Sequence, residues 1–375
     1  MKQILIIITL YCFVLCQNSS AIIRIDLNDE KSFQIVVDRE PGQYLGHPST
    51  CLLEDGKTIL CVYPKGHGRG AIIYKKSTNG GLTWSERLPT PKSWETSKET
   101  PTIHRIIDAR GKKRLILWSG LYPARFSISE DNGNSWSELK PVGDWGGIVV
   151  MGSLVQLKSP GHYLALFHDD GRYFSAKPVV QKPTVMTLLK TFSTDGGLSW
   201  SKPEAIFQLS EIHLCEPGSV RSPDEKEIAV LLRENTRRKN SHIIFSTDEG
   251  KTFTPPQEIT SVLTGDRHTA KYAPDGRLLV SFRKKSPAKI QDDYEGDWVA
   301  WVGKYSDLKN NTLGQYLIRL KDNLHQWDCA YPGVEVLPDG TFVLVTYGHW
   351  EKDEPPYILC IRFKLEQIDE KAKRK

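Results

Sequence analysis

The sequence contains the stretch Ser193-Thr-Asp-Gly-Gly-Leu-Ser-Trp200, and versions of it occur four times along the chain. The other copies begin at Ser77, Ser129 and Ser246, so the steps between copies are 52, 64 and 53 residues. The shared pattern Ser-x-(Asp/Asn)-x-Gly-x-(Ser/Thr)-(Trp/Phe) predicts a hairpin turn. In such a turn the Asp or Asn accepts backbone hydrogen bonds, the Gly takes a positive φ and the aromatic ring packs between sheets. A repeat of this length is typical of solenoids and propellers.

A second pattern, an apolar strand followed by a turn and another apolar strand, occurs six times. Its copies span residues 46–63, 100–119, 149–168, 216–233, 266–283 and 330–347. The first four copies each precede one of the eight-residue turns, and the last two each precede a further apolar strand. Six hairpins with additional strands predict an all-β chain folded as a six-bladed β-propeller. Residues 22–38 alternate as a strand and are expected to complete the last blade.

The two ends of the chain are expected to lie outside the propeller, which is assigned to residues 22–368. Residues 1–21 are expected to be a signal peptide, because Lys2 precedes an apolar run that is too short to span a bilayer and a polar segment ends at Ala21. The chain is therefore expected to be secreted or periplasmic, or a lipoprotein attached through Cys16. Residues 369–375 are expected to form a solvated basic tail.

Charge and cysteine content exclude several classes of function. Lys2 and the last six residues account for four of the five formal positive charges, so the body of the chain has no basic field suited to nucleic acid. The chain has neither a CxxC nor an HExxH motif, so no metal or other cofactor is expected. The five cysteines after residue 21 favour buried thiols, although Cys51 and Cys61 flank a turn evenly and could pair across it.

Hairpin geometry predicts which residues share a face, because residues equidistant from a tight turn lie opposite each other. The rule gives five facing pairs: Glu216 and Arg233, His268 and Arg283, Asp169 and Gly152, Tyr331 and Gly348, and His47 and Pro64. Every blade begins its innermost strand in the same direction, so these polar ends are expected to gather on one face. The opposite face carries ordinary turn residues, and the polar face is therefore expected to carry the function.

Three residues on the polar face are catalytic candidates. The hydroxyl of Tyr331 needs an adjacent base to act as a nucleophile at neutral pH, and Glu216 is the candidate base. His47 has a ring suited to general acid or base catalysis. The alternatives are a Tyr331 that caps a strand, a Glu216 that forms a salt bridge across its hairpin and a His47 that bonds a loop.

Other residues on this face are candidates for binding a substrate. Guanidinium groups bind carboxylates through two parallel hydrogen bonds, so an anionic sugar is the expected ligand. Asp169 follows His168 in a segment that either contacts the sugar or only shapes a turn. The substrate-binding candidates are Arg233, Arg283, Arg69, His67, Asp169 and His268.

The repeated phrase resembles the Asp-box, or BNR repeat, of the sialidase (neuraminidase) superfamily of β-propellers, and residues 40–365 as a whole look like that superfamily. The resemblance implies a Tyr–Glu nucleophilic pair, an Asp acid/base and three arginines that bind the substrate carboxylate. By motif, Glu216 in Glu-Pro-Gly-Ser-Val matches the glutamate and Tyr331 the tyrosine, while Arg233 and Arg283 match the second and third arginines. The implied function is an exported exo-glycoside hydrolase that acts on a terminal acidic sugar, sialic acid or a related one.

Two positions depart from the superfamily pattern. Gly46-His47-Pro48 stands where the first arginine belongs, and His67-Gly-Arg-Gly70 stands where the acid/base Asp belongs. Either His47 or His67 therefore takes over proton transfer, or the substrate is not an ordinary sialoside. Two other hypotheses stay open: a histidine-dependent propeller hydrolase or lyase acting beside a uronic acid, and a non-catalytic glycan-binding propeller. A monomer whose partner is a glycan with a carboxylate is expected.

Overall fold

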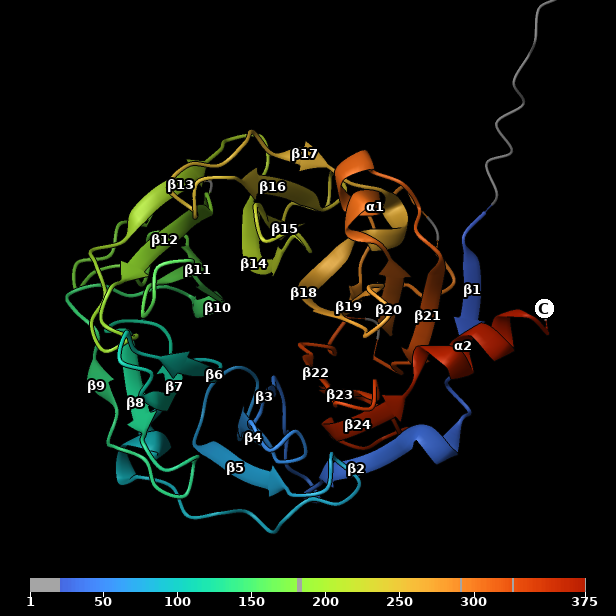
Figure 1. Cartoon of the computed structure of the whole chain (residues 1–375), viewed down its shortest axis with the longest axis horizontal. Helices are drawn as coiled ribbons and strands as arrows, with labels where there is room; N and C mark the ends of the chain where they lie inside the picture. The colour runs from blue at the N-terminus through green and yellow to red at the C-terminus, as the bar shows by residue number, and fades with distance from the viewer. Residues whose placement is uncertain (1–20, 181–183, 291, 326, 375) are drawn as a thin grey trace, which may run out of the picture.

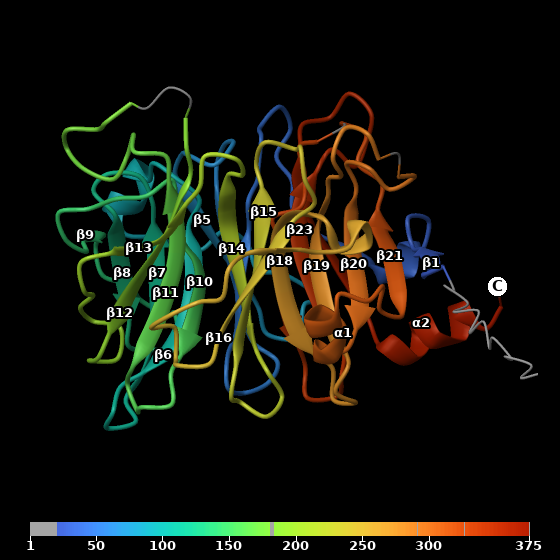
Figure 2. The same ribbon diagram turned by 90° about the horizontal axis from the view of Figure 1, so that it is seen from above.

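The strands of the protein form six sheets arranged as blades around a central axis (Figure 1). This computed structural model describes residues 21–180, 184–290, 292–325 and 327–374, so the signal peptide expected over residues 1–21 lies, apart from Ala21, outside the described residues. Seen from the side, the strands run between the two faces of the disc (Figure 2). The six-bladed β-propeller predicted from the sequence is confirmed.

The first three blades follow one another along the chain, and in each the strands run outward from the axis in sequence order. Blade one contains β3 (Ser49–Leu52), β4 (Ile59–Pro64) and β5 (Ile72–Ser77). Blade two contains β6 (Thr102–Ile107), β7 (Lys113–Ser119), β8 (Arg125–Ser129) and β9 (Lys140–Pro141). Blade three contains β10 (Val149–Gln156), β11 (Tyr163–Asp169), β12 (Thr187–Ser193) and β13 (Glu204–Gln208).

The last three blades repeat this plan, with two of them extended by the start of the chain. Blade four contains β14 (Leu214–Arg221), β15 (Ile228–Glu234), β16 (His242–Ser246) and β17 (Gln257–Glu258). Blade five contains β18 (Gly265–Tyr272), β19 (Leu278–Lys284), β20 (Trp298–Gly303), β21 (Tyr316–Lys321) and β1 (Ile23–Asp26). Blade six contains β22 (Gly333–Val336), β23 (Phe342–Gly348), β24 (Tyr357–Phe363) and β2 (Gln34–Asp38).

The start of the chain closes the ring with two strands, where the sequence predicts one. β2 pairs antiparallel with β24 and completes the last blade as expected. β1 pairs parallel with β21 and adds a fifth strand to the neighbouring blade. The short 3-10 helix η1 (Lys31–Phe33) lies between them. The start of the chain therefore ties two adjacent blades together.

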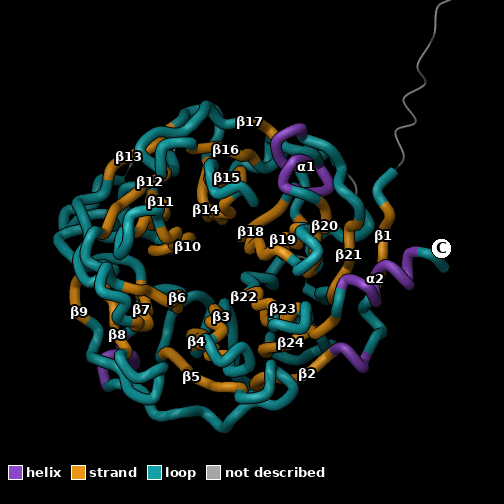
Figure 3. Tube along the Cα trace, viewed as in Figure 1, coloured by secondary structure: helices purple, strands orange, loops and turns teal. Residues whose placement is uncertain are grey.

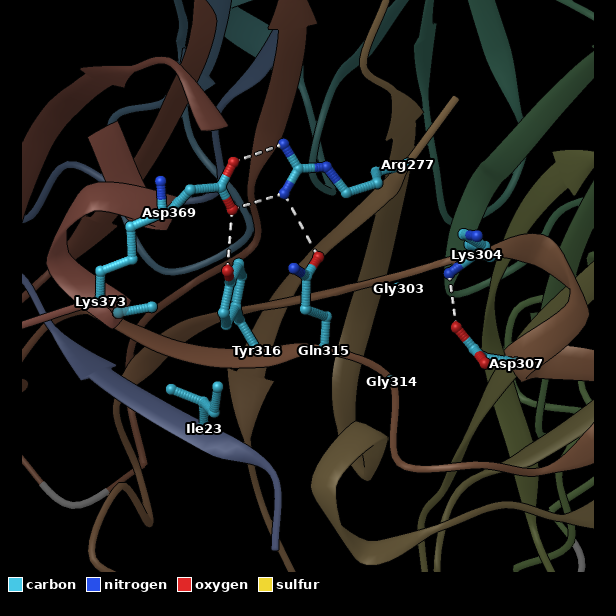
Figure 4. Close-up of a pocket in the computed structure, with 11 residues that line it drawn as sticks. Ile23, Arg277, Gly303, Lys304, Asp307, Gly314, Gln315, Tyr316, Asp369 and Lys373 are labelled. Carbon is cyan, nitrogen blue, oxygen red and sulfur yellow. Dashed lines mark hydrogen bonds and ion pairs between the residues drawn. The ribbon is translucent and has the colours of Figure 1, made fainter. Parts of the chain in front are cut away.

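The C-terminal residues also belong to the folded body. Helix α2 (Leu365–Ala372) crosses the boundary that the sequence placed after residue 368, and Ile368 is fully buried. Arg277 donates two hydrogen bonds to Asp369, and Tyr316 donates a third to the same carboxylate (Figure 4). Most of the expected basic tail is thus a docked helix, because its apolar side packs against blades five and six.

The remaining helical segments are short. They are η2 (Lys92–Thr96), η3 (Ser261–Leu263) and α1 (Tyr305–Asn310), and α1 lies toward the outside of the ring (Figure 3). Within the described ranges, no helix has the length and apolar character needed to cross a bilayer.

The four repeated turns have the geometry that their sequence predicts. In the third copy the Gly197 amide donates to Ser193 Oγ at 2.8 Å and the Ser199 amide donates to Asp195 Oδ1 at 2.9 Å. Gly197 has a φ of 83°, a conformation that glycine adopts without a steric penalty. The closing Trp200 is half-buried, with its ring 5.2 Å from the ring of Trp118 in blade two. These turns therefore lock neighbouring blades together.

The core consists of apolar layers between adjacent blades. Ile59 and Cys61 of β4, for example, pack against Val343 and Val345 of β23, and all four are fully buried. Burying side chains of this size stabilises the fold by about 1.5–3 kcal/mol each. Cys51 does not face Cys61, because Leu60 is its cross-strand partner, and both thiols are free. The pairing allowed by the sequence is therefore wrong.

The cross-strand pairs predicted from the turns hold only in blade one, where the observed register continues toward His47 and Pro64. In blades three, four and five a β-bulge interrupts the innermost strand near the polar face. In blade four the bulge alone places Cys215 opposite Arg233. In blades three and five the register already differs from the predicted one next to the turn, and the bulge shifts it further, so that Val149 faces His168 and Asp266 faces Arg283. In blade six the register differs by one residue, with Gly333 opposite Val345. The irregularity adds one residue in blades four and five and two in blade three, which symmetry about the turn cannot anticipate.

Candidate active site

Three side chains from blades four and six meet at the polar face. The Tyr331 hydroxyl donates a hydrogen bond to Glu216 Oε1 at 2.5 Å, and Arg233 Nη1 donates to the same oxygen at 2.7 Å. Arg233 Nη1 also lies 3.4 Å from the Tyr331 hydroxyl. Glu216 comes from β14, Arg233 from β15 and Tyr331 from the segment before β22. The predicted Tyr–Glu pair is thus in direct contact, although 115 residues separate its members.

The bulge in β14 explains how Glu216 reaches this position. Glu216 has a φ of 51°, which is rare for a residue with a side chain, and the register shifts between Cys215 and Gly218. A Cβ atom at Gly218 would lie 2.0 Å from the His268 carbonyl, so only glycine fits there. The Glu216 amide donates to Nδ1 of the buried His168 at 3.3 Å. The backbone conformation therefore turns Glu216 toward Arg233, even though Cys215 is the residue opposite it.

The charges of the three groups follow from their surroundings. Burial acts to raise the pKa of Glu216, but the Arg233 charge and the Tyr331 hydrogen bond outweigh it and hold that pKa below its usual value. Burial and the Glu216 charge raise the pKa of Tyr331 above its usual value. An ionised carboxylate therefore accepts a hydrogen bond from a protonated phenol. This is the arrangement in which a carboxylate can remove the phenol proton as the oxygen forms a bond.

The buried carboxylate of Asp266 forms ion pairs with two of the arginines that were predicted to bind substrate. Arg283 donates from Nε and Nη2 to Asp266 Oδ2 at 2.8 and 2.5 Å. Arg233 Nε lies 3.3 Å from Asp266 Oδ1, and Arg237 forms two further hydrogen bonds with the same carboxylate. Arg283 Nη1 donates to the carbonyl of Trp327. The Arg283 guanidinium thus has internal partners for each of its nitrogens.

Two further candidates, His268 and Asp169, form hydrogen bonds with groups other than the Glu216–Tyr331 pair. The His268 ring bonds the Leu263 carbonyl at 2.9 Å and packs on Phe282, and the side chain is almost completely buried. Asp169 accepts a hydrogen bond from the Gly171 amide at 2.5 Å, which is the turn-shaping role considered as its alternative. Burial raises the pKa of Asp169 to about 6.

His47 lies beside the pair but its two ring nitrogens are occupied. Nδ1 accepts a hydrogen bond from the Gly68 amide at 3.2 Å, and Nε2 lies 3.1 Å from the Tyr347 hydroxyl. The ring stacks on Tyr347 and its centroid is 4.7 Å from that of Tyr331. Burial lowers the pKa of His47 well below its usual value. His47 is therefore a neutral ring that holds the loop containing Gly68.

A second buried carboxylate, that of Asp328, contacts the polar groups of several aromatic side chains next to His47. Tyr44 and Tyr347 donate their hydroxyl hydrogens to it at 2.9 and 3.1 Å, and His349 Nε2 lies 3.3 Å away. The exposed His67 lies 2.7 Å from the Tyr44 hydroxyl through its Nδ1. Burial acts to raise the pKa of Asp328, but these partners hold it well below its usual value. The cluster fixes one wall of the site.

A cavity of about 280 Å³ opens beside the Glu216–Tyr331 pair. It is lined by six of the nine predicted site residues: His47, His67, Arg69, Glu216, Arg233 and Tyr331. Arg283, Asp169 and His268 are not among its lining residues. The cavity is close in size to the lower end of small-molecule sites, about 300–1,000 Å³.

The lining also includes polar residues that the sequence analysis did not select. These are Glu99, Thr100, His168, Arg172 and Asn235. Glu99 stands immediately before the second copy of the strand–turn–strand pattern, at the end where polar residues gather, and that position was the signal available in the sequence. Among the described residues, no group of three metal-ligating side chains is found.

The comparisons with known proteins agree with the fold. A protein of unknown function from Dyadobacter fermentans is 18% identical with a TM-score of 0.68, and the match covers 88% of this chain and 97% of that one. An α-L-arabinofuranosidase of Fusarium graminearum is 12% identical with a TM-score of 0.64, covering 90% and 98%. An intramolecular trans-sialidase of Ruminococcus gnavus is 14% identical with a TM-score of 0.59, covering 86% and 95%. At these identities the similarity establishes the fold alone.

No curated protein matches the chain in sequence. The BNR repeat-like domain matches residues 112–344, which is more than half of the chain and includes three of the four repeated turns. The protein therefore belongs to the BNR repeat-like domain family.

Proposed function

We propose that the protein is a retaining exo-glycoside hydrolase of sialidase type that releases a terminal acidic sugar from a glycan. The observation that carries the proposal is the 2.5 Å hydrogen bond from the Tyr331 hydroxyl to Glu216, beside the Arg233 guanidinium. A nucleophile in hydrogen-bond contact with a base that a third group orients is the arrangement expected for covalent catalysis. The small cavity beside it suits one terminal sugar better than the interior of a long chain.

In the proposed reaction the Tyr331 oxygen attacks the anomeric carbon of the bound sugar. As the new bond forms, the hydroxyl proton passes to Glu216 and the glycosidic bond breaks. Water then attacks the same carbon, the bond to Tyr331 breaks and Glu216 returns the proton to the tyrosine. Arg233 holds Glu216 in place and keeps it ionised before the reaction begins. Two displacements at one carbon give net retention of configuration.

The assignment of an acidic sugar rests on arginine side chains that are not paired with Asp266. Arg69 lines the cavity and is exposed. Arg267, the residue after Asp266, lines an adjoining cavity that shares Tyr331 with this one, and its buried Nη1 has no hydrogen-bond partner in the described part of the chain. A substrate carboxylate would supply the missing acceptor for a group that is costly to leave unpaired.

An uncharged terminal sugar is the second candidate, and one observation favours it. Arg283 and Arg233, which the superfamily pattern assigns to the substrate carboxylate, already contact the internal carboxylate Asp266. A site that carries its own carboxylate has less need of one from the substrate. The similarity in fold to an α-L-arabinofuranosidase makes a neutral pentose a natural member of the test panel.

The geometry of His47 argues against a histidine-dependent lyase or hydrolase. Both ring nitrogens have partners and the ring is buried, so the group is poorly placed to exchange protons with a substrate. A non-catalytic glycan-binding propeller would have no need of a phenol aligned with an ionised carboxylate.

The test combines a substrate panel with trapping of the covalent intermediate. Fluorogenic glycosides of sialic acid, a uronic acid and arabinofuranose identify the sugar class. A fluorinated analogue of the active sugar, which slows the second displacement, is then expected to label Tyr331, as located by mass spectrometry of peptides. Turnover with inversion of configuration, or labelling of another residue, would overturn the mechanism, and inactivity on every glycoside would favour the binding protein.

A further inference from the structure

The Tyr331–Glu216 pair supplies a nucleophile and its base, but the reaction also needs an acid for the leaving group. In the superfamily pattern that acid is an Asp at the position where this chain has residues 67–70, which contain no carboxylate. His47 is buried and occupied at both ring nitrogens. The exposed His67 also lines the cavity, but its Nδ1 is bonded to the Tyr44 hydroxyl, so a second carboxylic acid in the lining is the stronger candidate for the proton donor.

Glu99 is a carboxylic acid in the lining of that same cavity. It lies between η2 and β6, at the entry to blade two, whereas Glu216 belongs to blade four and Tyr331 precedes β22 of blade six. Figure 1 shows β6, β14 and β22 spaced around the central opening, one in every second blade. A sugar bound in the cavity would therefore meet Glu99 on a different side from the Glu216–Tyr331 pair.

Two glycines from separate loops leave the space that the Glu99 side chain fills. A Cβ atom at Gly68 would lie 2.9 Å from Glu99 Oε1, and one at Gly120 would lie 3.1 Å from Cβ and Cγ of the same side chain. Oε1 accepts hydrogen bonds from the amide and the hydroxyl of Thr100 at 2.8 and 3.0 Å. Oε2 has no hydrogen-bond partner in the described ranges, so one oxygen is anchored while the other is available to a ligand.

The surroundings of Glu99 favour its protonated form. Burial raises its pKa above the usual value, and this effect exceeds the lowering by the Thr100 hydrogen bonds and by the charges of Arg69 and His67. Arg267 also interacts with its charge. Glu216, in contrast, is held ionised by Arg233. Two carboxyl groups with pKa values displaced in opposite directions are the pattern expected for an acid and a base that work in one site.

We propose that Glu99 is the catalytic acid/base of this site. The inference rests on the proposed glycosidase function. In the first displacement the Glu99 proton moves to the departing glycosidic oxygen as the Tyr331 oxygen bonds to the anomeric carbon. In the second, the Glu99 carboxylate takes a proton from the attacking water as the bond to Tyr331 breaks. Glu99 and Glu216 thereby end the cycle in their starting protonation states.

The test compares Glu99→Gln with the wild type on two glycosides of the same sugar. One carries a nitrophenol, which leaves without protonation, and the other carries an alkyl alcohol, which does not. General acid catalysis contributes on the order of 100- to 10,000-fold. We expect kcat/KM of Glu99→Gln to fall at least about 100-fold for the alkyl glycoside and less than about 10-fold for the nitrophenyl glycoside. The basic limb of the pH profile is expected to disappear.

A second variant tests the same role by rescue. In Glu99→Ala, azide is expected to restore turnover of the nitrophenyl glycoside and to give a glycosyl azide of retained configuration, because an anion needs no base to attack. Glu95→Gln, an exposed glutamate in η2, is the matched control and is expected to match the wild type. Equal loss on both leaving groups together with an unchanged pH profile would overturn the role of Glu99. Full activity of Tyr331→Phe would instead overturn the proposed function itself.

Discussion

Asp266 accepts hydrogen bonds from Nε and Nη2 of Arg283 on a single oxygen, with both groups almost completely buried. The two residues face each other across β18 and β19 because a bulge shifts the register between Asp266 and Thr269. Arg233 and Arg237 contact the same carboxylate. One negative charge thus organises three cations next to Tyr331, and Arg283 lies under the ring of Tyr331 with its central carbon 5.6 Å from the ring centroid.

Replacement of Asp266 by Asn is expected to destabilise the fold by about 3–5 kcal/mol, because it leaves buried guanidinium groups without their counter-charge. The measurement is chemical unfolding at neutral pH. Asp293→Asn, an exposed change in the same blade, is the control and is expected to have little effect. A stability loss for Asp266→Asn no larger than that of this control would contradict the assigned role.

The same carboxylate predicts a dependence of stability on acid. The three arginines depress the folded-state pKa of Asp266 against the opposing effect of burial. Its contribution is therefore fully present above the unfolded pKa, about 3.9, and is lost as the pH falls through the lower folded pKa. Unfolding curves recorded between neutral pH and pH 2 are expected to show this loss in the wild type and not in Asp266→Asn.

Replacement of Tyr331 by Phe is expected to lower kcat on the order of 1,000-fold or more, because the nucleophilic oxygen is removed while the ring is kept. Steady-state kinetics on the best substrate of the panel measures the effect. The control is Tyr272→Phe, at the last residue of β18, which removes a hydroxyl that donates a hydrogen bond to the Arg221 carbonyl. This variant is expected to keep full activity. Comparable rates for the two variants would exclude Tyr331 as the nucleophile.

His47 is expected to act by position, through its contact with the Gly68 amide. His47→Asn, whose side chain can still accept a hydrogen bond, is expected to keep more activity than His47→Ala, and both should retain the pH profile of the wild type. Rate measurements from pH 4 to pH 9 provide the comparison. A limb of the profile that vanishes in both variants would show instead that His47 titrates in catalysis.

Arg69 is expected to contribute to substrate charge recognition. A hydrogen bond to a charged group is worth about 1.5–3 kcal/mol, so Arg69→Ala should raise KM for an acidic glycoside by about 10- to 100-fold. A neutral glycoside, if it is turned over, should be affected much less. The exposed Arg110 lies on the turn face, and Arg110→Ala is the matched control. Equal effects on charged and neutral substrates would assign Arg69 to packing.

Asp297 predicts a second pH effect, of opposite sign. Burial raises its pKa to about 7, and the nearby Asp322 adds to the shift. A carboxyl group with a raised folded pKa stabilises the fold below the unfolded pKa, and this contribution is lost as the pH rises through about 7. The melting temperature of Asp297→Asn minus that of the wild type is therefore expected to be larger at pH 8 than at pH 4. Parallel melting curves across this range would contradict the prediction.

The sequence by itself determined the architecture, because both of its repeats depend on interactions between residues that are close together in the chain. The turn around Asp195 and Gly197 is specified by side chain-to-backbone hydrogen bonds and a positive φ within eight residues. The spacing of apolar residues along each strand then determines which faces are buried between blades. The placement of Glu216 and Tyr331 on one face was predictable from these elements, since every inner strand enters from the same face, whereas their contact also depends on the bulge in β14.

Only the tertiary structure decided the identity of the groups around that pair. The bulge in β14 turns Glu216 toward Arg233, and the shifted register and bulge of β18 place Asp266 opposite Arg283, where His268 was expected. Glu99 became a candidate only once two distant glycines were seen to make room for it. Such contacts depend on the packing of one blade against another, and a local pattern carries no record of the cavity that remains between them.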